Sequence, residues 1–95
     1  MNKYEMMFIV KTMEETEASK IAEDLKTVIT SMKGEITEFK DLGNKKLAYP
    51  INKEVTGIYY VVNFNADNEI ITELDRKAKI NESVIRHMII RLDEE

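Results

Sequence analysis

The chain has 95 residues, of which 43% are hydrophobic and 34% charged, a composition that excludes intrinsic disorder and favours one small globular core. It contains no cysteine, which excludes disulfides and thiolate metal sites and favours a reducing compartment. No apolar run approaches the roughly 20 residues that span a bilayer, and the amino terminus lacks signal-peptide organisation. We therefore expect a cytoplasmic protein without membrane association.

The net charge of −4 argues against a simple polyanion binder, but the charge is unevenly distributed. Residues 14–24 contain five carboxylates and one lysine, whereas residues 40–53 and 76–91 each have an excess of basic side chains. Such a chain can present one basic surface to phosphates while its acidic side faces solvent. The same pattern is also typical of ordinary solvated faces, so charge alone leaves both interpretations open.

The first predicted element is a strand over residues 3–10, where apolar residues occur on both alternating faces. One face carries Glu5, Met7 and Ile9, which is too apolar for free solvent, so we expect a central strand.

A helix follows. Thr12 and Glu15 have the spacing of a capping box, and acidic residues in the first turn suit the positive end of the helix dipole. Apolar residues at three- and four-residue spacing from Ala18 to Met32 predict one buried helical face. Gly34 is predicted to end this helix as its C-terminal cap.

After the helix, the hydrophobic period returns to two. A strand is predicted over residues 36–51, with a bend or bulge at Gly43. Pro50 places this strand at a sheet edge, because proline cannot donate to the ladder. Residues 52–57 are polar and predict a loop into another alternating strand over residues 58–64.

The second helix has candidate N-caps at residues 65–67 and is predicted to end at residues 80–82. A β-branched strand over residues 84–92 follows, and an acidic tail, residues 93–95, closes the chain. We expect one domain over residues 1–92.

The element order is β-α-β-β-α-β, which predicts an α+β, ferredoxin-like split βαβ fold with a four-stranded antiparallel sheet and two helices on one face. Right-handed crossovers place the first and third strands in the middle. The other sheet face would stay uncovered, and an apolar uncovered face usually binds a partner. Its predicted residues are Glu5, Met7, Ile9, Tyr59, Val61 and Asn63.

Residue patterns for catalysis are missing from the sequence. His87 is the only histidine, so it has no ligand cluster and no nucleophile to activate. Glu14 and Glu15 are adjacent, and adjacent helical side chains point apart. The three glycines are scattered and form no phosphate-cradling loop. We therefore expect no catalytic residues, metal, cofactor or small-molecule substrate.

Lys45, Lys46 and Tyr49 lie together on the predicted edge strand. Lysines beside a tyrosine can bind phosphate and stack on a base, although lysine pairs are also common on solvated edges. Tyr49 is therefore open to two interpretations, a stacking residue or a packing residue.

The segment Gly43-Asn44-Lys45-Lys46-Leu47-Ala48-Tyr49-Pro50-Ile51-Asn52 resembles the signature of the bacterial small-subunit ribosomal protein six family. The resemblance extends over the whole chain, through Lys3-Tyr4-Glu5, Leu74-Asp75-Arg76 with Lys79-Ile80, and Val84-Ile85-Arg86-His87-Met88-Ile89-Ile90. It implies a ferredoxin-like fold, no enzymatic activity, no metal, and binding to 16S ribosomal RNA together with small-subunit ribosomal protein eighteen.

Carried over residue by residue, the resemblance implies RNA contacts at basic residues and one tyrosine, namely Lys3, Lys45, Lys46, Tyr49, Lys53 and Arg86. Arg76 and Lys79 are weaker candidates and could simply be solvated. Many members of the family carry two basic residues before the first tyrosine. This chain has Asn2 and Lys3 there, so we expect a weaker amino-terminal phosphate contact.

We hypothesise that the uncovered face, through Met7, Ile9, Tyr59 and Val61, binds protein eighteen, and that the pair then recognises folded RNA. A net acidic protein with few phosphate contacts should bind RNA weakly alone. The rival hypothesis is a ferredoxin-like module that dimerises or senses a small ligand through the same face.

Overall fold

The computed structural model describes residues 2–51 and 53–92, and it confirms the ferredoxin-like fold. The predicted acidic tail, residues 93–95, lies outside the described residues, as does Asn52. The elements, in chain order, are β1 (Asn2–Lys11), α1 (Glu15–Ser31), β2 (Glu35–Ile51), β3 (Glu54–Ala66), α2 (Asn68–Ile80) and β4 (Val84–Leu92).

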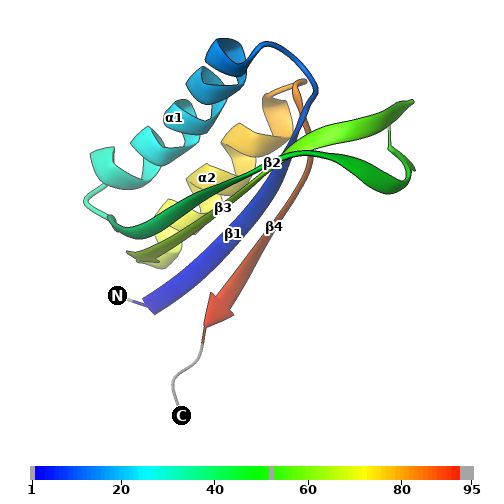
Figure 1. Ribbon diagram of the computed structural model, residues 1–95. Coiled ribbons are helices and arrows are strands. Elements are labelled where there is room, and N and C mark those ends of the chain that lie inside the picture. Colours follow the sequence, from blue (N-terminus) through cyan, green and yellow to red (C-terminus); the bar gives the residue numbers. More distant parts are fainter. Residues whose placement is uncertain (1, 52, 93–95) are drawn as a thin grey trace.

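The sheet is antiparallel with the strand order β2-β3-β1-β4, so the first and third strands are central and the proline-bearing strand is an edge, as predicted. Figure 1 shows α1 and α2 side by side on the same face of this sheet. The described helices leave the opposite face uncovered, and we refer to it as the open face.

The core lies between the helices and the covered face of the sheet. Phe8, Met6 and Phe64 are fully buried there, and the apolar residues of both helices pack against them. The Phe8 and Tyr60 rings stack with centroids 5.2 Å apart, and Phe39 continues the stack at 5.7 Å from Tyr60. This face of the sheet therefore resembles an ordinary protein interior.

The predicted capping box at Thr12 is wrong. The N-cap of α1 is Glu14, whose carbonyl accepts from the backbone N–H of Ala18 at 3.0 Å. The Thr12 hydroxyl instead lies 2.7 Å from the Thr56 hydroxyl and 3.3 Å from Asn44 Oδ1. A tertiary contact has replaced the local cap that the sequence pattern offered.

Helix α1 ends just before Gly34, as predicted, but the role of Gly34 at this end of the helix differs from the predicted one. Lys33 takes the left-handed backbone conformation, with φ of 72°. The Gly34 N–H donates to the Ile29 carbonyl at 2.8 Å and the Lys33 N–H to the Thr30 carbonyl at 3.1 Å, which is a Schellman motif. A Cβ at Gly34 would lie 2.8 Å from Ile29 Cγ2, so glycine permits close packing.

The predicted loop over residues 52–57 is wrong for its described part, because β3 already begins at Glu54. Figure 1 shows that the distal parts of β2 and β3 form a two-stranded ribbon that projects beyond the helices and the rest of the sheet. We call residues 44–51 and 53–57 the arm. The β2 part of the arm was predicted as a strand, but the β3 part, residues 54–57, is mostly polar and was therefore read as a loop. The predicted bulge at Gly43 is confirmed, with a register shift there and φ of 87°.

Within residues 2–51 and 53–92, no helix is long and apolar enough to cross a membrane.

Candidate protein- and RNA-binding surfaces

The open face has an apolar row that crosses three strands. Met7 of β1 is paired with Val61 of β3 on one side and with Met88 of β4 on the other. Directly paired residues of antiparallel strands point to the same side of a sheet, so these three side chains are neighbours. Met88 is 46% exposed, and Ile90, two residues further along β4, is 44% exposed. Large apolar side chains with this exposure leave a surface that a partner could cover.

A second row lies beside the first, where Ile9 is paired with Tyr59 and with Arg86. The four residues that we predicted for the protein interface therefore share one face, in two adjacent rows. Their accessibility differs, because Ile9 is only 4% exposed whereas Met7, Tyr59 and Val61 are partly exposed. Ile9 can contribute little direct contact area, and the two rows need other residues to complete a surface.

Those other residues are Met88 and Ile90, which the sequence analysis did not assign to the open face. The sequence of β4 contains a pattern that could have identified these two residues. In β4 the exposed residues Arg86, Met88 and Ile90 alternate with His87 and Ile89, which are partly buried on the helical side. Once β4 is placed beside β1, this alternation assigns Met88 and Ile90 to the open face.

The arm carries exposed cations. Lys45 and Lys46 lie on its β2 strand and Lys53 at its turn, and all three are exposed. Lys45 is paired with Gly57, which is also paired with Lys11 at the end of β1. Lys11 is exposed and joins the basic residues at the root of the arm, although the sequence analysis missed it. A lysine at the end of a strand has no motif that would single it out.

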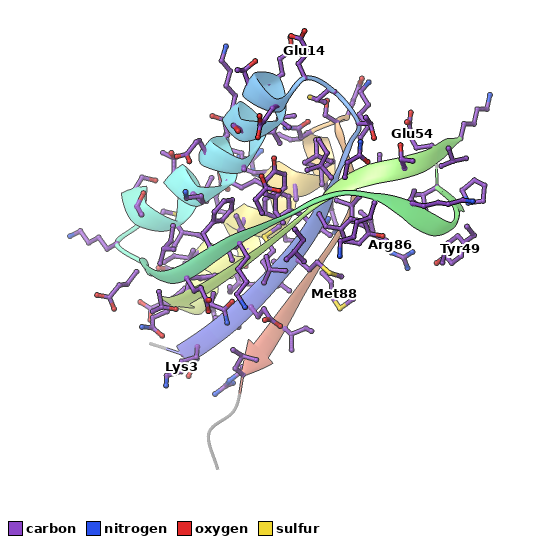
Figure 2. The ribbon with its side chains drawn as sticks, viewed as in Figure 1. Lys3, Glu14, Tyr49, Glu54, Arg86 and Met88 are labelled. Atoms are coloured by element: carbon purple, nitrogen blue, oxygen red, sulfur yellow. The ribbon has the colours of Figure 1, made fainter. Side chains whose placement is uncertain are left out.

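Tyr49 and Arg86 meet across the gap between the arm and β4. Figure 2 shows Arg86 pointing from β4 toward Tyr49, which extends from the arm, with Met88 further along β4. Arg86 Nη1 donates to the Tyr49 hydroxyl at 2.7 Å, and the guanidinium carbon lies 5.9 Å from the ring centroid. The hydrogen bond to Tyr49 raises the pKa of the Arg86 guanidinium. Two predicted RNA-binding residues are thus brought together.

Lys3 lies at the opposite end of the sheet from the arm, as Figure 2 shows. It is paired with Leu92 of β4 and Asn65 of β3, and Lys11 lies eight positions further along β1. At about 3.4 Å per residue, that separation is roughly 27 Å. The structure therefore does not bring Lys3 together with the basic residues of the arm.

Arg76 and Lys79 lie on α2, on the other side of the sheet from the open face. Arg76 donates two hydrogen bonds to Glu73, at 2.7 and 3.0 Å, and Lys79 forms an ion pair with Asp75 at 3.0 Å. The hydrogen bond from Arg76 lowers the pKa of Glu73. These two cations are occupied by carboxylates of their own helix, away from the arm.

The role of His87 is structural. Its Nε2 lies 2.7 Å from Asp75 Oδ1, in a partly buried contact that ties β4 to α2. Hydrogen bonds from His87 and Lys79 lower the pKa of Asp75. The described residues contain no group of three or more side chains that could hold a metal ion.

The helical side differs from the open face in charge. A groove of about 1010 Å³ lies between α1 and α2, and its charged lining consists of three carboxylates and one lysine: Asp24, Glu69, Glu73 and Lys77. Phosphates would be repelled more by this side than by the arm.

An antiparallel split βαβ sheet with one covered face, one apolar open face and a basic arm defines a class of protein, a small ferredoxin-like binding domain. The comparisons with known proteins give the family. The model of the family described as Ribosomal protein S6 matches residues 3–91.

Relatives named small ribosomal subunit protein bS6 are 42% identical in Thermoanaerobacter pseudethanolicus and 44% identical in Alkaliphilus metalliredigens, each over 99% of this chain and 100% of the relative. The relative from Geotalea uraniireducens is 41% identical over 100% of this chain and 75% of its own length. The crystal structure of 30S ribosomal protein S6 from Thermotoga maritima superposes with a TM-score of 0.91 at 31% identity, covering 96% of this chain and 87% of that one.

The chain belongs to the ribosomal protein S6 family, a family of structural, non-enzymatic components of the small ribosomal subunit. The resemblance noted in the sequence is confirmed.

Proposed function

We propose that the protein binds 16S ribosomal RNA jointly with small-subunit ribosomal protein eighteen, as one domain over residues 1–92. The observation that carries this proposal is the continuity of two surfaces on one side of the molecule. The apolar row of Met7, Val61 and Met88 adjoins the row that contains Arg86, and Arg86 contacts the arm. One side can therefore bind an apolar protein surface and phosphates at the same time.

The division of labour follows from the side chains. Met88 and Ile90 supply the exposed apolar area, so the protein partner covers this part of the open face. Lys45, Lys46 and Lys53 supply cations on the arm, and each contact with a phosphate releases counterions. Phosphate contacts position a protein on RNA without reading the sequence, so recognition depends on RNA shape and on the partner.

Weak binding by the protein alone is expected from the charge balance. The net charge of −4 opposes approach to RNA over long distances, and only a few lysines gather on the arm. A basic partner on the open face would offset this repulsion. Joint binding should therefore be much tighter than binding by this protein alone.

The test is a titration of a 16S rRNA central-domain fragment with the purified protein, with and without protein eighteen, over a salt series. Tight binding that needs both proteins and weakens with salt is the expected result. Equal binding with and without protein eighteen would remove the joint mechanism. Absence of RNA binding in both cases, combined with self-association, would favour the rival hypothesis of a dimerising module.

A further inference from the structure

The arm lacks support from the rest of the sheet over most of its length. Pairing between β1 and β3 ends at Lys11 and Gly57, but pairing between β2 and β3 continues through Lys46 and Thr56 to Ile51 and Glu54. A two-stranded ribbon alone is marginally stable in water. The orientation of the arm, and of its lysines, therefore depends on the contacts that tie it to other elements.

The root of the arm is fixed by packing and by hydrogen bonds. A Cβ added at Gly57 would lie 2.4 Å from Ile9 Cγ2 and 3.6 Å from Ile85 Cδ1, so the arm backbone lies close against these two side chains. Leu47 is only 6% exposed although it lies beyond the end of β1. Thr12 adds its hydroxyl contact with Thr56. These contacts hold the first residues of the arm.

Further out, Tyr49 contacts Arg86 through both its hydroxyl and its ring. The contact is solvent-exposed, with Tyr49 56% exposed, and exposed contacts of charged groups contribute little to stability. Removing water from such a contact strengthens both its hydrogen bond and its cation–π component. The Tyr49–Arg86 contact is thus weak in the free protein and would become stronger if it were covered.

A partner on the open face would cover it. Arg86 lies in the row of Ile9 and Tyr59, directly beside the apolar row that contains Met88. Figure 2 shows Met88 and Arg86 as neighbours along β4, with Tyr49 just beyond Arg86. A protein seated on Met88 therefore reaches the flank of the Tyr49–Arg86 contact.

We infer that Tyr49 is a positioning residue whose contact with Arg86 couples partner binding on the open face to RNA binding by the arm. This inference rests on the proposed function. When the partner covers the contact, the arm is held in one orientation, and its lysines no longer lose freedom when RNA binds. Coupling of this kind is reciprocal, so bound RNA strengthens partner binding by the same factor.

The quantity to measure is the coupling factor, the Kd for the rRNA fragment without protein eighteen divided by the Kd with saturating protein eighteen. Tyr49→Phe removes the hydroxyl and retains the ring. We expect it to lower the coupling factor roughly fivefold. Because the coupling factor is a ratio, any loss of RNA affinity that is equal with and without the partner leaves it unchanged. A base-stacking tyrosine would behave differently, because phenylalanine stacks equally well and the coupling factor would not change.

Two further variants separate positioning from phosphate binding. Arg86→Lys keeps the positive charge but loses the planar donor geometry, so we expect the same loss of coupling, and no additional loss when it is combined with Tyr49→Phe. Lys46→Ala is the matched control on the arm. It should lower RNA affinity equally with and without the partner, leaving the coupling factor unchanged.

A coupling factor that Tyr49→Phe and Arg86→Lys leave at the wild-type value would overturn the inference and leave the proposed function intact. If wild-type protein binds no RNA even with the partner, the proposed function fails instead. Hydrogen exchange of the arm amides then tests the contact separately. Exchange should slow when protein eighteen binds the wild-type chain but not when it binds Tyr49→Phe, and equal slowing in both proteins would also overturn the inference.

Discussion

Both faces of the sheet carry apolar strand residues, but the two faces differ in what covers them. On the helical face Met6, Phe8, Val62 and Phe64 are at most 1% exposed, because α1 and α2 lie over them. On the open face the neighbouring residues Met7 and Val61 are partly exposed, and Met88 and Ile90 almost half exposed. Consecutive residues of one strand thus lie in two environments, the folded core on one side and the proposed binding surface on the other.

This difference explains why the strands have so little polar alternation. An antiparallel strand with one solvated face normally alternates between apolar and polar residues. In β1, Met7 and Ile9 interrupt this alternation on the open face, whereas Glu5 and the residues near both ends of the strand are charged there. An apolar centre of this kind fits the partner-binding role proposed above. The helices complete the core on the helical side, and the open side is where the proposed partner would bind.

The largest expected effect is a difference between two consecutive residues of β1 in how much their substitution lowers the free energy of unfolding. Phe8→Ala removes a fully buried ring that stacks on Tyr60, so the free energy of unfolding should fall by about 3–5 kcal/mol. Met7→Ala, on the open face, should cost less than about 1 kcal/mol. Urea denaturation of both variants measures the difference. Equal losses would mean that the open face contributes to the folded core as much as the helical face does.

Gly57→Ala should have an intermediate effect on the free energy of unfolding, since Gly57 packs closely against Ile9 at the root of the arm. The new Cβ would overlap Ile9 Cγ2 at 2.4 Å, so we expect a loss of about 1–3 kcal/mol in the free energy of unfolding. The same measurement on Ile9→Ala/Gly57→Ala should show a loss smaller than the sum of the two single variants, because Ile9→Ala removes the Cγ2 methyl that the new Cβ would overlap. Losses that simply add would place the strain elsewhere in the arm.

The smallest effect concerns the contact between the helical layer and β4. Hydrogen bonds from His87 and Lys79 lower the pKa of Asp75, so its ionised form is stabilised in the folded state. A carboxyl with a depressed folded pKa contributes stability above its unfolded pKa, about 3.9, and that contribution is lost as the pH falls through the folded pKa. Asp75→Asn should therefore show a shallower loss of stability below about pH 4. Denaturation curves at several acidic pH values test this, and parallel curves for both proteins would contradict it.

Much of the fold could be predicted from the sequence, because the spacing of hydrophobic residues along the chain depends on local secondary structure alone. The alternation in β1 and the three- and four-residue spacing in α1 identified their buried faces, and Pro50 identified the edge strand. The prediction failed where a tertiary contact replaced a local one. Thr12 matched a capping box, yet its hydroxyl contacts Thr56 instead.

The candidate site was only partly predictable for the same reason. The basic residues of the arm were identified by the family resemblance, and the open face by topology. The contact between Tyr49 and Arg86 joins residues 37 positions apart and depends on the curvature of the arm, which no local pattern encodes. Met88 and Ile90 required the pairing of β4 with β1 before their alternation could be interpreted.

The most direct test of the account compares one charge substitution on each side of the molecule. Met88→Glu places a carboxylate on the open face, and Ile80→Glu places one on α2, where Ile80 is 61% exposed. Both variants should fold, and joint binding to the 16S rRNA fragment with protein eighteen is the measurement. We expect Met88→Glu to weaken joint binding by at least about tenfold and Ile80→Glu to remain within about twofold of wild type. Unchanged binding by Met88→Glu, or an equal loss in both variants, would contradict the assignment of the open face as the binding surface.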